Sequence, residues 1–245
     1  MHALPRLLLL GLALVLTAAA QTAPAPVPDP SVGVTKRGNA RFYELHAQHL
    51  KRAKEPMQLL FIGDSITEGW TKAPDVWAEH YAPYQAANFG IGGDQTQHVI
   101  WRIEDGVLDG VKPKVVVLML GTNNSGRNTG EQIAAANAKI VGLIRAKIPE
   151  AKVLVLAIFP RGPRKNRDGT PEDHAGRMQE IAKANTLLAQ MADGEQVHFL
   201  DINSAFLDAA GRIPDSIMPD QLHPNVEGYR RWAAAMRPKL DELMK

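Results

Sequence analysis

Met-Gln-Leu-Leu-Phe-Ile-Gly-Asp-Ser-Ile-Thr-Glu-Gly-Trp, residues 57–70, is the most informative stretch of this 245-residue sequence. An apolar run of strand length ends at Gly63, and a helical pattern begins directly after Asp64 and Ser65. A serine there lies at the carboxyl end of a strand, where open α/β sheets bind ligands, and at a helix N-terminus, which favours negative charge. Because Ser and Asp are also common helix caps, this stretch alone leaves capping and chemistry as equal alternatives.

Apolar segments of strand length alternate with helical patterns along the chain. We expect strands near residues 57–63, 85–89, 114–120, 152–158 and 197–201. We expect helices near residues 40–52, 66–80, 95–108, 130–147, 173–192 and 225–243. Continuous apolar runs in two of the strands are typical of a parallel sheet that helices cover on both faces. The repeated β–α units predict a three-layer α/β/α sandwich with a five-stranded parallel sheet of order 2-1-3-4-5, a flavodoxin-like architecture.

Charge and cysteine content exclude several classes of function. With 28 basic and 26 acidic residues the formal net charge is +2, which argues against a nucleic-acid partner bound by phosphate neutralisation. The sequence has no cysteine, which excludes a thiol nucleophile and thiolate metal sites. His46 and His49 fall on one predicted helix, but two histidines without a third ligand make a weak metal site. We therefore expect neither a metal nor a cofactor.

The N-terminus has the three-part pattern of a secretory signal peptide. Arg6 precedes an apolar run, Leu7–Leu16, that is too short to span a bilayer comfortably, and small residues follow it up to Ala20. We expect cleavage after Ala20, no membrane insertion of the mature chain, and a secreted or periplasmic location; an uncleaved anchor is the alternative. The predicted division of the chain is a signal peptide at 1–20, a proline-rich leader at 21–39 and one domain at 40–245.

Four loops that should gather at one edge of a parallel sheet carry polar residues. They are Gly63–Ser65, Asn88–Asp94, Gly121–Asn124 and Asp220–Pro224. Acyl transfer by a serine needs a histidine to take the hydroxyl proton, a carboxylate to orient that histidine, and N–H donors for the oxyanion. Each loop alone has a structural alternative, such as a tight turn, a cap or a packed histidine. Together they supply nucleophile, oxyanion donors, acid and base, which favours a hydrolase.

These residues make the chain similar to the SGNH, or GDSL, hydrolases over about residues 57–236. Gly63-Asp64-Ser65 resembles the first sequence block of that family, and Gly93 the glycine of the second. Gly121-Thr122-Asn123 resembles the third block, and Asp220-x-x-His223 the last. Within the family, Asn-Phe-Gly-Ile-Gly-Gly-Asp-Gln-Thr from residue 88 and Phe-Pro-Arg-Gly from residue 159 resemble the platelet-activating-factor acetylhydrolase catalytic subunit branch.

The resemblance implies a role for each matching residue. Ser65 would be the nucleophile, His223 the general base, and Asp220 the carboxylate that orients His223. The backbone N–H groups of Ser65 and Gly93, with the side-chain amide of Asn123, would form the oxyanion hole. The sequence lacks the Gly-x-Ser-x-Gly elbow of α/β-hydrolases, so we expect Ser65 to open a helix rather than occupy a strained turn.

Other residues near the predicted site have less defined roles. We expect Asp64 to bind N–H groups of its own loop, and Arg102 to be a buried charge bonded to loop carbonyls. The loop at 161–174 is basic at its start and follows the fourth predicted strand, so it borders the site. Contact with a polar or acidic substrate and simple solvation are equal alternatives for this loop.

We therefore predict a serine esterase that hydrolyses short-chain, especially acetyl, esters through an acyl-enzyme, with small-molecule or glycan esters as substrates. The resemblance also allows a homo-oligomer. The alternatives are a lysophospholipase or thioesterase for longer acyl chains, a non-catalytic carbohydrate-binding protein of the same fold, and a flavodoxin-like nucleotide binder. The last would need a phosphate-cradling loop after the first strand, where this chain has few glycines.

Overall fold

The structure is a computed structural model of the chain, and it describes residues 27–166 and 168–245. The predicted signal peptide and its cleavage site lie outside these described residues. Within the described ranges, no helix combines the length and the apolar character that crossing a membrane requires.

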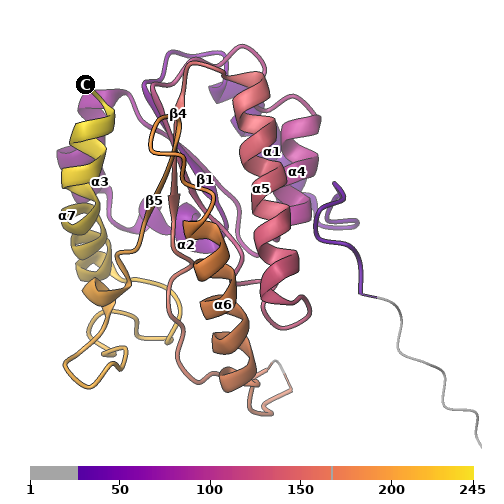
Figure 1. Cartoon of the computed structure of the whole chain (residues 1–245), viewed down its shortest axis with the longest axis vertical. Coiled ribbons are helices and arrows are strands. Elements are labelled where there is room, and N and C mark those ends of the chain that lie inside the picture. Colours follow the sequence, from indigo (N-terminus) through magenta and orange to yellow (C-terminus); the bar gives the residue numbers. More distant parts are fainter. Residues whose placement is uncertain (1–26, 167) are drawn as a thin grey trace, which may run out of the picture.

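A sheet lies at the centre of the molecule, between layers of helices (Figure 1). It has five strands, and every neighbouring pair is parallel. The strands are β1 (Leu59–Gly63), β2 (Ala87–Gly90), β3 (Val115–Met119), β4 (Lys152–Leu156) and β5 (Val197–Leu200). Their order across the sheet is β2-β1-β3-β4-β5, which confirms the predicted topology. Because all strands run the same way, the loops that follow them meet at one edge of the sheet.

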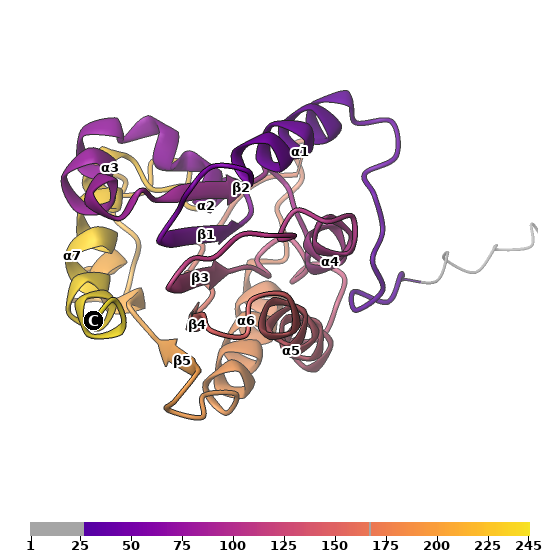
Figure 2. The same ribbon diagram turned by 90° about the horizontal axis from the view of Figure 1, so that it is seen from above.

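Helices cover both faces of the sheet, as Figure 2 shows from above. The longer helices are α1 (Ala40–Arg52), α3 (Pro74–Tyr81), α4 (Thr96–Glu104), α5 (Gly130–Lys147), α6 (His174–Ala189) and α7 (Val226–Leu243). Side chains of β1 alternate between two cores: Leu60 and Ile62 pack with α4, α5 and α6, whereas Leu59 and Phe61 pack with α3 and α7. Burial on both faces explains why the strands are continuous apolar runs.

The helix predicted at 66–80 is in fact three shorter elements. The short helix α2 spans Ser65–Glu68, a 3-10 turn follows at Gly69–Lys72, and α3 begins at Pro74. Proline has no backbone N–H and a fixed φ near the helical value, so it opens a new helix and cannot continue the preceding one. The helix predicted at 95–108 also ends early, before Gly106, whose φ of 95° is not helical.

Residues 30–39, called the N-terminal segment below, lie against α4 (Figure 2). The hydroxyl of Thr96 donates to the carbonyl of Pro30 at 2.9 Å, and the N–H of Val34 donates to the carbonyl of Gln97 at 3.0 Å. Part of the predicted proline-rich leader is therefore bonded to the domain. Asn39 then caps α1 by accepting from a backbone N–H of the first turn.

Candidate active site

Ser65 is the first residue of α2 and lies at the carboxyl end of β1. Asp64, and not Ser65, caps this helix: its Oδ1 accepts the N–H of Ile66 at 2.9 Å. The hydroxyl of Ser65 is therefore not used as a cap. It lies 2.8 Å from Nε2 of His223, which is 158 residues away in the sequence.

His223 belongs to the loop before α7, and Asp220 of the same loop fixes its imidazole. Oδ2 of Asp220 lies 2.7 Å from Nδ1 of His223, and Oδ1 accepts the backbone N–H of His223 at 2.7 Å. Partial burial opposes ionisation of Asp220, but the hydrogen bonds from His223 and from Arg164 outweigh it and hold the pKa of Asp220 well below its usual range. The carboxylate is thus charged and oriented toward the ring.

Gly93 follows β2 and brings a backbone N–H to the same pocket. Its φ of 71° lies in the left-handed region, which glycine adopts at little cost. In the described part of the chain, this N–H donates a hydrogen bond to no other group. Asn123 lines the same pocket and donates from Nδ2 to the carbonyl of Asp94 at 2.9 Å and to Oδ2 of Asp64 at 3.3 Å.

Buried charges support the loop that contains Gly93. Asp94 is fully buried and forms ion pairs with Arg102, at 2.9 Å, and with Lys36, at 2.6 Å. Arg102 also donates to the carbonyl of Phe89 at 2.9 Å, as expected for a structural charge. Burial raises the pKa of Asp64 to about 7, although the hydrogen bond from the N–H of Ile66 acts in the opposite direction.

The pocket above Ser65 has a volume of about 400 Å³ and a mostly polar wall. Its lining residues are Ser65, Gly93, Asn123, Arg161, Arg164, Glu172, Arg177, Leu222 and His223. Glu172 forms ion pairs with Arg161 and, at 3.5 Å, with Arg177. The loop at 161–174 therefore contributes three side chains to the wall. Arg177 lies beyond that loop, in the first turns of α6, and no motif in the sequence marks it.

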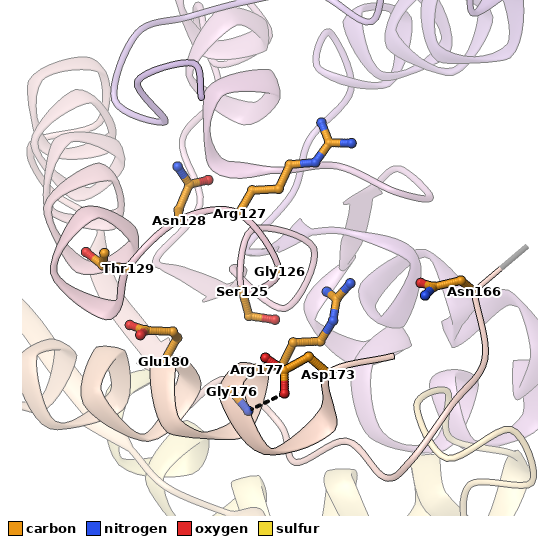
Figure 3. Close-up of a pocket in the computed structure, with 10 residues that line it drawn as sticks. All are labelled: Ser125, Gly126, Arg127, Asn128, Thr129, Asn166, Asp173, Gly176, Arg177 and Glu180. Atoms are coloured by element: carbon orange, nitrogen blue, oxygen red, sulfur yellow. Dashed lines mark hydrogen bonds between the residues drawn. The ribbon is translucent and has the colours of Figure 1, made fainter. Parts of the chain in front are cut away.

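Arg177 also lines a second pocket, of about 370 Å³ (Figure 3). Arg177 points from α6 toward the loop between β3 and α5, where its guanidinium occupies the space that a side chain at Gly126 would fill. Asp173 caps α6 by accepting the N–H of Gly176 at 2.9 Å, the bond drawn in Figure 3. The two pockets share Arg177, so this side chain separates the space above Ser65 from its neighbour.

His46 and His49 have structural partners. Nε2 of His46 lies 2.8 Å from a carboxylate oxygen of Asp105, and the ring of His49 stacks on Phe89 with centroids 4.7 Å apart. Burial lowers the pKa of His49 to about 3, and the nearby charge of Arg102 adds to this effect. Across the described residues, no three His, Asp or Glu side chains are grouped closely enough to hold a metal ion.

Comparison with known proteins relates this geometry to a family. The model of the GDSL-like lipase/acylhydrolase family matches residues 61–231, which include the serine and histidine described above. The chain belongs to this family. It is thus a GDSL-type ester hydrolase, as the sequence predicted.

Curated relatives match most of the GDSL hydrolase. Platelet-activating factor acetylhydrolase IB subunit alpha1 of Homo sapiens is 36% identical over 210 residues, which are 85% of this chain and 86% of that protein. Subunit alpha2 of Rattus norvegicus is 35% identical over 212 residues, which are 85% of this chain and 87% of that protein. The predicted resemblance to this branch is therefore confirmed.

Solved structures support the fold of the GDSL hydrolase. A GDSL-like lipase from Bacteroides thetaiotaomicron superimposes with a TM-score of 0.65 and 20% identity, covering 82% of this chain and 97% of that one. A carbohydrate acetylesterase from Sinorhizobium meliloti superimposes with a TM-score of 0.59 and 20% identity, covering 76% and 98%. At these identities the comparison supports a common fold.

The comparisons correct one prediction about the GDSL hydrolase. The secreted or periplasmic location expected from the N-terminal residues is wrong, because the curated relatives are intracellular, cytosolic enzymes. A basic residue followed by an apolar run and small residues is a short compositional pattern, and the 1–20 segment that carries it lies outside the described residues.

Proposed function

We propose that this GDSL hydrolase is a serine esterase that uses Ser65, His223 and Asp220. The observation that carries the proposal is the continuous chain of contacts from Ser65 Oγ to His223 Nε2, at 2.8 Å, and from His223 Nδ1 to Asp220 Oδ2, at 2.7 Å. These contacts allow the imidazole to take the serine proton while the carboxylate stabilises the charge that develops on the ring.

The reaction proceeds through an acyl-enzyme. Ser65 Oγ attacks the ester carbonyl carbon as its proton passes to His223, and the carbonyl oxygen becomes an oxyanion. The N–H groups of Ser65 and Gly93 and the amide of Asn123 donate to that oxygen. Asn123 turns from its longer contact, the 3.3 Å bond to Asp64, toward the oxyanion. His223 then protonates the leaving alkoxide, and a water molecule repeats these steps to release the acid and regenerate Ser65.

The pocket wall favours a short acyl group and a polar alcohol. Three arginines and one glutamate line it. Among the described residues that line the pocket, Leu222 has the only aliphatic side chain. A long alkyl chain would have to lie on guanidinium groups and strip their water, which is unfavourable. An acetyl group needs little room beside Leu222. We therefore propose acetyl esters of small molecules or glycans as substrates.

The test compares rates on p-nitrophenyl esters from acetyl to palmitoyl for the wild type, Ser65→Ala and a matched control, Ser204→Ala. Ser204 is exposed in a 3-10 turn and does not line the pocket. We expect acetyl hydrolysis that fades beyond butyryl, is lost in Ser65→Ala and is unchanged in Ser204→Ala. Maximal activity on long chains would replace the short-acyl proposal with the lysophospholipase or thioesterase alternative. Full activity in Ser65→Ala, or none in a folded wild type, would contradict the mechanism.

A further inference from the structure

We propose that Lys36 is a positioning residue for the oxyanion loop, which we define as Gly92–Asp94. It comes from the N-terminal segment, 56 residues before the loop in sequence, and is not among the described residues that line the pocket above Ser65. Through this one side chain the N-terminal segment is joined to the oxyanion loop. The inference rests on the proposed role of Gly93 as an oxyanion donor.

Lys36 holds the loop on both sides of Gly93. Its Nζ donates to the carbonyl of Gly92 at 2.7 Å and lies 2.6 Å from Oδ1 of Asp94. A Cβ atom placed on Gly93 would lie 3.8 Å from the same nitrogen, so the ammonium group is directly beside this residue. The Gly92 carbonyl belongs to the same peptide group as the Gly93 N–H. Fixing the carbonyl oxygen therefore fixes the direction of the N–H, because the peptide is planar.

Neutralising Asp94 does not by itself explain Lys36. Arg102 is fully buried and already pairs with the other carboxylate oxygen of Asp94 at 2.9 Å. A second cation on the same buried carboxylate is costly to desolvate, and the Lys36 side chain is only 11% exposed. What Lys36 adds is the bond to the Gly92 carbonyl, which Arg102 does not make.

The N-terminal segment is fixed well enough to deliver Lys36. Its backbone bonds to Thr96 and Gln97 of α4 hold it in place, and the ammonium of Lys139 donates to the carbonyl of Ser31 at 3.0 Å. The Lys36 ammonium also lies 5.2 Å from the ring centroid of Phe42, a cation–π distance that favours one position for the side chain. Contacts with α1, α4 and α5 thus hold the segment that carries Lys36.

The test uses Lys36→Met, which keeps the length of the side chain, with Lys36→Arg as the conservative variant. Arg37→Met is the control, because it removes the same charge from the neighbouring exposed residue. We expect Lys36→Met to lower kcat about 10- to 100-fold while KM changes less than threefold, since loss of one oxyanion donor costs about 100- to 1,000-fold. Lys36→Arg should recover part of kcat, and Arg37→Met should match the wild type.

A second readout does not depend on hydrolysis. In a Ser65→Ala background, the amide ¹H–¹⁵N signals of Gly93 and of the Asn123 side chain should shift on Lys36→Met and stay in place on Arg37→Met. If the wild type is inactive, the proposed function fails, and these signals alone decide whether Lys36 positions the loop. Unshifted signals, a kcat within twofold of the wild type, or an equal loss in Lys36→Arg accompanied by a lower Tm would overturn the proposal.

Discussion

Two neighbouring asparagines in the loop after β3 have separate tasks. Asn123 lines the pocket above Ser65 and is partly exposed, so its amide can reach a bound ester. Asn124 is completely buried: its Nδ2 donates to Thr96, and its Oδ1 accepts the backbone N–H of that residue at 3.1 Å. The first side chain thus faces the reaction, whereas the second joins the β3 loop to the start of α4.

This division predicts opposite effects for two matched substitutions. Asn123→Ala should lower kcat about 100-fold or more, because it removes an oxyanion donor. Asn124→Ala should lower the free energy of unfolding by about 1–3 kcal/mol, because it leaves buried polar groups without partners. Steady-state kinetics and urea unfolding of both variants test the prediction. Equal effects of the two substitutions on kcat would contradict it.

Residues at the ends of strands could be predicted, whereas residues that act across the fold could not. Ser65 could be predicted because it follows an apolar run of strand length, and His223 because Asp220-x-x-His223 resembles the last sequence block of the family. Lys36 and Arg177 carry no such signal. Their importance comes from packing: Lys36 meets a loop 56 residues away, and Arg177 lies against Gly126.

At the scale of the elements, helix α4 depends on a histidine in its first turn. Nδ1 of His98 accepts the backbone N–H of Gln95 at 3.0 Å, which requires that this nitrogen carry no proton. Burial lowers the pKa of His98 to about 4, and the charges of Lys36 and Arg102 contribute in the same direction. As the pH falls, His98 of an unfolded chain is protonated near pH 6.5, whereas His98 of the folded chain is protonated only near pH 4.

A fall in pH should therefore lower the free energy of unfolding, because His98 of α4 is uncharged in the folded chain. Between about pH 6.5 and 4 the unfolded state binds one more proton at His98 than the folded state does, so stability falls as pH falls. His98→Gln keeps an acceptor and removes the titration. We expect its free energy of unfolding to lie below that of the wild type at pH 7.5, and the difference to shrink by about 3 kcal/mol by pH 4. Urea unfolding at both pH values tests this; a constant difference would contradict it.

The elements also show which local sequence signals are strong enough to predict the bounds of a helix. The bounds of α1 and α5 match the predicted 40–52 and 130–147, because each begins at a side-chain cap and carries a clear apolar face. The helix predicted at 66–80 failed at Pro74, although proline is a known helix starter. The apolar spacing continues across this position and predicts one helix, whereas the proline predicts a break. The structure has the break, and Trp70 of the intervening 3-10 turn is buried in the core.

At the scale of the whole molecule, the last helix holds the first loop of the site. Tyr229 of α7 is fully buried, and its hydroxyl donates to the carbonyl of Ile66 at 2.7 Å. Ile66 directly follows Ser65, so a contact spanning 163 residues fixes the short helix that carries the serine. Because α2 has only four residues, it has little stability of its own and depends on such contacts.

Removing this single hydroxyl should therefore affect both stability and rate. Tyr229→Phe keeps the ring in the aromatic core but leaves the Ile66 carbonyl without its donor. We expect the free energy of unfolding to fall by about 1–2 kcal/mol. Loosening α2 should also lower kcat several-fold, because small displacements of a nucleophile reduce the fraction of reactive geometries.

Tyr43→Phe is the matched control for this prediction, because Tyr43 lies in α1, is 41% exposed and contributes its ring rather than a bonded hydroxyl. Urea unfolding and kcat on p-nitrophenyl acetate should separate the two variants, with Tyr43→Phe close to the wild type in both measurements. A Tyr229→Phe variant that loses stability with an unchanged kcat would mean that α2 is fixed by packing alone. In that case the link between the last helix and Ser65 would be structural, and the rate would depend on the loops at the edge of the sheet.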